Sequence, residues 1–425
     1  MLSLIACLII LVVVSLLLSG RVFPFVALSL VPTLGALASG FSFREVSDFY
    51  TEGSLQVMPI AVMFMFSILY FGIMNDMGLF KPLITGLIKH CRGSKVAITI
   101  GTVLIAIVAH LDGSGSSTFL MTIPPLIPLY DSMKIDRRLL LLLVCASASV
   151  MNMLPWGGPL GRASSVIKMD PMEFWSVLVF LQLIAICLVL LMSIYLGRRE
   201  ERKGNQGELS PRLADDPLHS TTNSRLYWIN LALTLFMLAV LFTGALPSAL
   251  VFMLAVSLAL WINYPGYKQQ ADCVKSHAGD ALILASIIVS AGAFLGILDG
   301  SGMLNSLSND IVAILPASII PKLHVIIGFL GVPMEMLLNT DAYYFALLPV
   351  IEQTVGNHGV ESFAIASAMT IGNVIGIFIS PFSPALWLGL GLAQVNIGAH
   401  IRYSFLWIWG LSAALMVFAM LLKIF

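Results

Sequence analysis

The residues best suited to bind a charged ligand lie in four short polar interruptions of otherwise apolar runs: "HLDGSGSST" (110–118), "LPWGGP" (154–159), "LNTDAYY" (338–344) and "SPFSP" (380–384). Glycines let a ligand approach the backbone closely, and hydroxyls donate hydrogen bonds. We expect the four interruptions to meet near the middle of a membrane. Free N–H groups where broken helices begin favour anions, so we expect this meeting point to bind an anion. The candidate substrate-binding residues are Ser114, Gly115, Ser116, Ser117, Thr118, Asn152, Pro155, Trp156, Gly157, Gly158, Arg162, Asn339, Thr340, Asp341, Ser380 and Ser383.

One basic residue, Arg162, follows the Pro-Gly interruption at 154–159. The stretch after that interruption is long enough to form a half-helix that completes a membrane crossing. A buried arginine in such a segment costs several kcal/mol, so it marks a functional site. In the alternative interpretation the helix ends at Trp156, an aromatic anchor, and Arg162 is merely interfacial.

Asp112, Asp341 and His110 are the candidates for binding a metal ion or a proton. Two carboxylates and one arginine would suit an anion that carries a metal ion or is coupled to a proton. The alternative role for each aspartate is to cap a helix at its tip. The unperturbed imidazole titrates near neutral pH, which suits a proton relay. We favour the alternative for His110, a hydrogen-bonded packing residue.

The composition places the chain in a membrane. It has 59% hydrophobic and only 10% charged residues, with a mean hydropathy of +0.97. A net charge of zero argues against a nucleic-acid partner. The five cysteines form no Cys-x-x-Cys pair, so they suggest neither a disulfide framework nor a zinc site. No phosphate-binding loop or dinucleotide fingerprint is present, which excludes an ATP-driven pump within this chain. We therefore expect an all-α polytopic membrane protein, embedded in the lipid bilayer of the cell membrane.

The apolar runs predict ten spans, two re-entrant hairpins and one polar linker. The hairpins are expected at about 95–130 and 317–354, where a polar centre divides a run too long for one span. The linker, 198–224, separates a first unit at 1–197 from a second at 225–425. The expected spans are 2–20, 23–41, 57–76, 138–154, 173–197, 225–242, 246–264, 279–298, 359–380 and 403–424.

The two units align with each other. "FGIMNDMGLF" (71–80) matches "LGILDGSGML" (295–304), and the same offset pairs Pro125 with Pro349 in the two hairpins. Each unit has five spans plus a hairpin. Because five is odd, the sequence predicts two inverted-topology repeats.

The basic residues predict the orientation. With the linker in the cytoplasm, most of the 22 lysines and arginines, Arg21 among them, fall in cytoplasmic loops. Both termini then lie outside the cell. The first hairpin opens to the cytoplasm and the second to the outside.

Five segments in order resemble the citrate–divalent metal:proton symporters (CitMHS), part of the ion transporter superfamily: "LYFGIMNDMGLF" (69–80), "HLDGSGSSTFLMTIPPLIPLY" (110–130), "MNMLPWGGPLGRASSV" (151–166), "NTDAYYFALLPV" (339–350) and "GLAQVNIGAHIRYSF" (391–405). The resemblance covers nearly the whole chain. It implies import of citrate or a related polycarboxylate as a complex with a divalent metal such as Mg²⁺ or Ca²⁺, coupled to protons. It also implies an elevator-type homodimer and a transporter, not an enzyme.

The chain departs from that family at the first tip, where the common pattern is Leu-Asp-Gly-Asp-Gly-Thr-Thr-Thr. Ser114 replaces the second aspartate, which removes a hard oxygen ligand and a proton carrier, so metal dependence is expected to differ here. The alternative function is a sodium-coupled carrier of di- or tricarboxylates or other organic anions. An ion channel and an intramembrane enzyme using His110 or an aspartate pair are the other classes, although no protease motif supports the enzyme.

Overall fold

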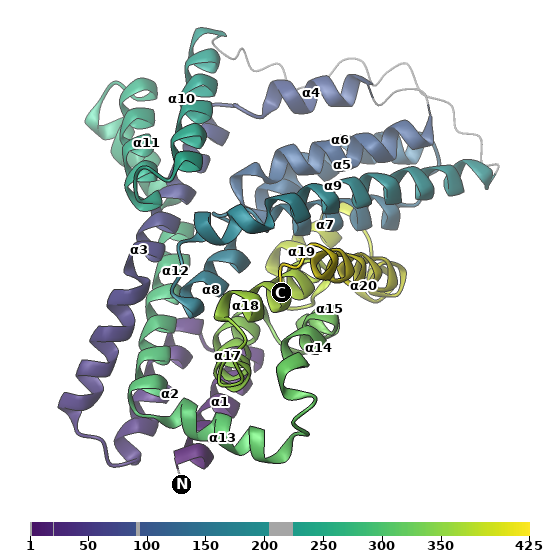
Figure 1. Ribbon diagram of the computed structural model, residues 1–425. Helices are drawn as coiled ribbons and strands as arrows, with labels where there is room; N and C mark the ends of the chain where they lie inside the picture. Colours follow the sequence, from purple (N-terminus) through teal and green to yellow (C-terminus); the bar gives the residue numbers. More distant parts are fainter. Residues whose placement is uncertain (1, 20, 91–93, 204–223) are drawn as a thin grey trace.

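The computed structural model describes residues 2–19, 21–90, 94–203 and 224–425, and these residues form helices joined by short turns (Figure 1). The predicted linker 198–224 therefore lies mostly outside the described residues. The first part contains α1 (Leu2–Ser19), α2 (Pro24–Ala38), α3 (Phe43–Asp76), α4 (Lys81–His90), α5 (Lys95–Ala109), η1 (His110–Asp112), α6 (Gly115–Ser132), α7 (Arg137–Met151), α8 (Gly158–Ile167) and α9 (Pro171–Arg202).

The second part is also helical, and its expected hairpin is divided into shorter elements than α5 and α6. Its helices are α10 (Ser224–Thr243), α11 (Ser248–Asn263), α12 (Tyr267–Gly300), α13 (Met303–Ile314), η3 (Ile320–Lys322), α14 (Leu323–Phe329), α15 (Gly331–Leu337), α16 (Thr340–Ala342), η4 (Tyr343–Leu347), α17 (Leu348–Gly356), α18 (Ser362–Val374), η5 (Ile377–Ile379), α19 (Pro384–Ala393) and α20 (Ile397–Leu421).

Among the described residues, seven helices are long and apolar enough to cross a membrane, or up to eight if a bent pair is one span. Three of the ten expected spans are instead shorter apolar helices, α1, α2 and α11. At 1.5 Å per residue, the 15 residues of α2 extend only about 22 Å, less than the roughly 30 Å hydrocarbon core. Whether these three helices cross the bilayer stays a prediction.

The long helices α3 and α12 pack side by side along the left of the view in Figure 1. Their backbones approach closely where Gly53 of α3 faces Gly292 and Gly296 of α12. A Cβ at Gly53 would lie 2.1 Å from the Gly292 carbonyl oxygen. Small residues at this spacing let membrane helices pack backbone to backbone. Helices α2 and α11 also pack on this pair, which forms one body of the protein.

Both segments in which a hairpin is expected are broken helices. In the first, α5 and η1 lead to Gly113, whose φ of 73° favours glycine, and Ser114 then caps α6 by accepting a hydrogen bond from the Ser117 N–H. In the second, the helices ending at Phe329 and starting at Gly331 are bent by 72°, which is consistent with a broken or re-entrant segment.

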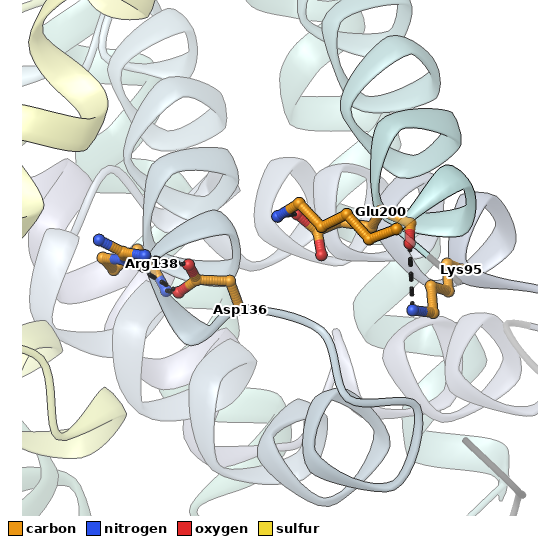
Figure 2. Close-up of polar contacts among 5 residues, drawn as sticks. Lys95, Asp136, Arg138 and Glu200 are labelled. Atoms are coloured by element: carbon orange, nitrogen blue, oxygen red, sulfur yellow. Dashed lines mark hydrogen bonds and ion pairs between the residues drawn. The ribbon is translucent and has the colours of Figure 1, made fainter. Parts of the chain in front are cut away.

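Charged residues lie at the base of the first hairpin (Figure 2). The Lys95 ammonium, at the start of α5, donates to the backbone carbonyl of Glu200 on α9 at 3.2 Å. Both residues are almost fully buried. The Glu200 carboxylate pairs with Lys203, and Arg138 at the start of α7 pairs with Asp136 at 2.6 Å. Of these contacts, the one between Lys95 and the Glu200 carbonyl joins the start of α5 to α9.

Replacing Gly296 with alanine is expected to lower the melting temperature of the detergent-purified protein. The new Cβ would lie 2.3 Å from the Phe49 carbonyl oxygen, and overpacking of this kind costs about 1–3 kcal/mol. Gly279→Ala on the same helix is the control, because nothing lies within 4 Å of its Cβ position. It should melt at the same temperature or higher, since alanine favours helix. Equal melting of the two variants would contradict the close packing of α3 on α12.

Candidate functional site

The four polar interruptions meet around one cavity of about 800 Å³. Each contributes the beginning of a helix: α6, α8, α16 and α19. The remaining wall comes from the α1–α2 connection, including Arg21, which the sequence analysis assigned to a cytoplasmic loop. The cavity is lined by Leu17, Arg21, Val22, Phe23, Pro24, Gly113, Gly115, Ser116, Asn152, Gly158, Pro159, Arg162, Asn339, Thr340, Asp341, Ile377, Phe378, Phe382, Ser383, Pro384 and Ala385.

Arg162 lies on the wall of this cavity. Its Nε donates to Asp341 Oδ1 at 2.7 Å, and the two side chains are only 14% and 13% exposed. The pair joins α8 in the first part of the chain to the tip of the second hairpin. Gly158 leaves room for the guanidinium, because a Cβ there would lie 2.8 Å from an Arg162 terminal nitrogen. Arg162 therefore forms an ion pair on the cavity wall, and its position relative to the membrane interface stays a prediction.

Asp112 is used within its own tip. One carboxylate oxygen accepts from the Ser114 N–H at 2.8 Å, and the other accepts from the Ser117 hydroxyl. Asp112 therefore stabilises the turn before α6, whereas the N-cap of that helix is Ser114. Its side chain does not line the cavity in this conformation, whereas the neighbouring Gly113, Gly115 and Ser116 do.

His110 is fully buried and hydrogen-bonded at both ring nitrogens. Nδ1 is 2.7 Å from Thr118 Oγ1, and Nε2 is 3.0 Å from Asn152 Oδ1. The ring also packs edge-on against Phe378 of η5. These contacts agree with the packing role favoured above, and they connect the first tip to the end of α7.

The interruption between α7 and α8 is fastened to the first tip. Trp156 Nε1 donates to the Leu111 carbonyl at 2.9 Å, so Trp156 is a structural link here. Pro155 lies in the same non-helical turn. Any side chain at position 157 would clash, because a Cβ on Gly157 would lie 2.3 Å from the Asn152 carbonyl oxygen. Of the residues predicted in this segment, Asn152, Gly158 and Arg162 line the cavity.

The second tip is built by Asn339 and Thr340. Asn339 Oδ1 caps α16 by accepting from the Ala342 N–H at 2.8 Å, and its amide donates to the Leu17 carbonyl of α1. The Thr340 hydroxyl donates to Glu335 at 2.6 Å. Asp341 faces Arg162, so its capping alternative is not what the structure shows. Asn339, Thr340 and Asp341 all line the cavity, as predicted.

The interruption between α18 and α19 completes the site. Ser383 precedes Pro384 at the beginning of α19 and lines the cavity. Ser380 points away from it, since its hydroxyl donates to the Glu335 carbonyl at 2.8 Å. The first tip packs closely on this segment, because a Cβ on Gly115 would lie 2.6 Å from the Phe378 ring.

One carboxylate next to the cavity escaped the sequence analysis. Glu335 of α15 is 1% exposed and accepts hydrogen bonds from Thr340 and Asn373. It lies one helical turn before the polar tip, inside an apolar run. In the sequence, its one signal is an ionisable residue inside an apolar run, and such residues in membrane segments mark functional sites.

The cavity is suited to an anion. Four helix N-termini face it, and each carries free N–H groups and a partial positive charge. The guanidinium of Arg162 adds a full charge that matches a carboxylate in geometry. Within the described residues, the one group of three closely spaced metal-ligand side chains is Asp76, Cys273 and His277, none of which lines this cavity.

Comparisons with known proteins show the family to which the chain belongs. Residues 1–372 match the family model described as "Citrate transporter" (CitMHS). A Bacillus subtilis protein named "Citrate transporter" is 32% identical over 425 residues, covering 100% of this chain and 99% of that protein. Another from the same organism, "Mg(2+)/citrate complex secondary transporter", is also 32% identical, over 96% of this chain and 95% of that protein.

The fold has a solved counterpart. The crystal structure of the Alcanivorax borkumensis YdaH transporter superposes with a TM-score of 0.61, covering 88% of each chain at 16% identity. This likeness concerns the fold alone. With the family match and the two relatives, it identifies the chain as an all-helical, multi-pass membrane protein that belongs to the CitMHS citrate transporter family, whose members are transporters and not enzymes.

Proposed function

We propose that this protein imports citrate or a closely related polycarboxylate, as a complex with a divalent metal, by secondary active transport coupled to protons. The observation that carries the proposal is the convergence of four helix N-termini and Arg162 on one cavity. The printed names of the two relatives, a citrate transporter and a Mg²⁺/citrate complex secondary transporter, support the substrate class.

Substrate recognition follows from the lining residues. A substrate carboxylate would take the place of Asp341 beside Arg162, because both are anions and the guanidinium already points into the cavity wall. Ser116 and Thr340 would donate hydroxyl hydrogen bonds to further carboxylates. Gly115 and Gly158 permit close approach of the substrate to backbone N–H groups.

The divalent metal enters this account as cargo. Magnesium and calcium prefer oxygen ligands, and citrate supplies several of its own. Asp341, once released from Arg162, is the cavity carboxylate available to a metal–citrate complex. Asp112 would join it only if it gave up its hydrogen bonds to Ser114 and Ser117.

The architecture proposed for transport is a pair of inverted-topology repeats at 1–197 and 225–425. The matching order and lengths of their helices support it, from α1–α4 against α10–α13 to the hairpin and broken helix of each part. In an elevator-type movement the hairpins and broken helices would shift relative to the body built on α3 and α12. We propose a homodimer in the cell membrane, with both termini outside and the 198–224 linker in the cytoplasm.

Proteoliposomes containing the purified chain are expected to accumulate labelled citrate when Mg²⁺ and an inward proton gradient are present. Arg162→Ala should abolish uptake, since an interaction between an ionised side chain and a buried partner is worth about 1.5–3 kcal/mol or more. Arg44→Ala is the control, because Arg44 lies in the exposed first turn of α3. If citrate uptake depended on sodium and did not change with pH, the coupling ion would be sodium and not the proton.

Two outcomes would reject the proposal. No citrate-dependent flux under any cation gradient would exclude citrate transport. Uptake at the wild-type rate by a folded Arg162→Ala variant would remove Arg162 from the substrate site.

Ser114→Asp restores the carboxylate common at this position in the family, and it should strengthen the dependence of uptake on Mg²⁺. An added carboxylate at the tip supplies a hard oxygen ligand next to the cavity. The measurement is the Mg²⁺ concentration that gives half-maximal citrate uptake, with Ser114→Asn as the uncharged control. An unchanged Mg²⁺ profile would place the cation away from the first tip.

A further inference from the structure

We propose that Glu335 is the proton-binding site of this transporter and that it exchanges its proton with the cavity through the Thr340 hydroxyl. The inference rests on the proposed function above and assigns its proton to one residue. It starts from the position of Glu335 on α15, one turn before the second tip, where the side chain is 1% exposed.

The Glu335 carboxyl is held by both polar elements of the second half. Oε1 lies 2.6 Å from Thr340 Oγ1 at the hairpin tip, and Oε2 accepts from the Asn373 amide of α18 at 2.8 Å. The Ser380 hydroxyl, in the interruption after α18, fixes the backbone of the same residue by donating to its carbonyl. Any movement of the tip relative to the broken helix would therefore change the hydrogen bonds of this carboxyl.

The surroundings favour the neutral acid. Arg162, the cation whose charge reaches Glu335, forms its ion pair with Asp341 instead. Asp341 brings a like charge, and the neighbouring Tyr343 and Tyr344 are fully buried and carry no cation. A buried carboxylate without its own cation costs several kcal/mol, whereas the protonated acid keeps both hydrogen bonds.

Thr340 gives the proton a path. It lines the cavity, whereas Glu335 lies behind it. When Glu335 is protonated, its O–H donates to the Thr340 oxygen, and the hydroxyl hydrogen of Thr340 turns toward the cavity. One hydroxyl therefore connects the buried carboxyl with cavity water, and proton transfer needs no larger opening.

The same tip couples the proton to the substrate. Thr340 directly precedes Asp341, the residue that a substrate carboxylate would displace from Arg162. Once displaced, Asp341 is an uncompensated negative charge near Glu335, and the substrate adds more. Both charges favour the protonated carboxyl, so substrate and proton strengthen each other's binding, as symport requires.

The decisive variant is Glu335→Gln, which reproduces the size and hydrogen bonds of the neutral acid but cannot release a proton. Gradient-driven citrate accumulation in proteoliposomes should fall about tenfold or more, while exchange of external labelled citrate for internal citrate stays within about threefold of wild type. Glu335→Asp should keep gradient-driven uptake. The control is Glu352→Gln in the same hairpin, whose partner is Ser362 and which does not line the cavity.

Three results would overturn the inference: wild-type accumulation by Glu335→Gln, loss of exchange together with accumulation in that variant, or failure of the variant to fold. A stability measurement separates this inference from the proposed function. Wild-type protein should lose stability relative to Glu335→Gln as pH rises, because only the wild type must ionise a buried carboxyl. A stability difference between the two proteins that does not change with pH would reject Glu335 as the proton-binding site, even if the wild-type protein transported no citrate in liposomes.

Discussion

The ion pair between Arg162 and Asp341 is the interaction on which the rest of the site depends. A guanidinium facing four helix N-termini is surrounded by like partial charges, so it requires an anion beside it. Asp341 meets that requirement in this conformation, and a carboxylate substrate would meet it in the loaded one. The pair is thus an internal substitute for the ligand. It also explains why the interrupted helices converge where they do.

That convergence imposes a second constraint. Non-helical backbone at membrane depth must be covered by protein or line a cavity, because lipid cannot satisfy its hydrogen bonds. Hydrogen bonds between the interruptions, such as Trp156 to Leu111 and Ser380 to Glu335, cover part of it. The end of α1 closes the remaining side through the Leu17 carbonyl, which accepts from Asn339. Away from the cavity, the close contact of Gly53 with α12 holds α3 and α12 backbone to backbone.

Sequence was informative where polarity interrupted an apolar run. Both hairpins and both broken helices were predicted from such interruptions, and Arg162 stood out because the charge pattern left it without a loop. Glu335 was missed because one carboxylate inside an apolar run leaves the average polarity unchanged. The place of Arg21 on the cavity wall was also hidden, because contacts between distant segments depend on the fold. Asp112 and His110 needed coordinates, because their partners are set by the turn at Gly113 and by α7.

The central claim is that the cavity between the two hairpin tips and the two broken helices is the substrate site. A cryo-electron microscopy structure determined with saturating Mg²⁺ and citrate tests it most directly. The account predicts ligand density in this cavity, with a carboxylate against the Arg162 guanidinium and Asp341 displaced from its present 2.7 Å contact. Density elsewhere in the protein, with the Arg162–Asp341 pair intact and this cavity free of ligand, would contradict it.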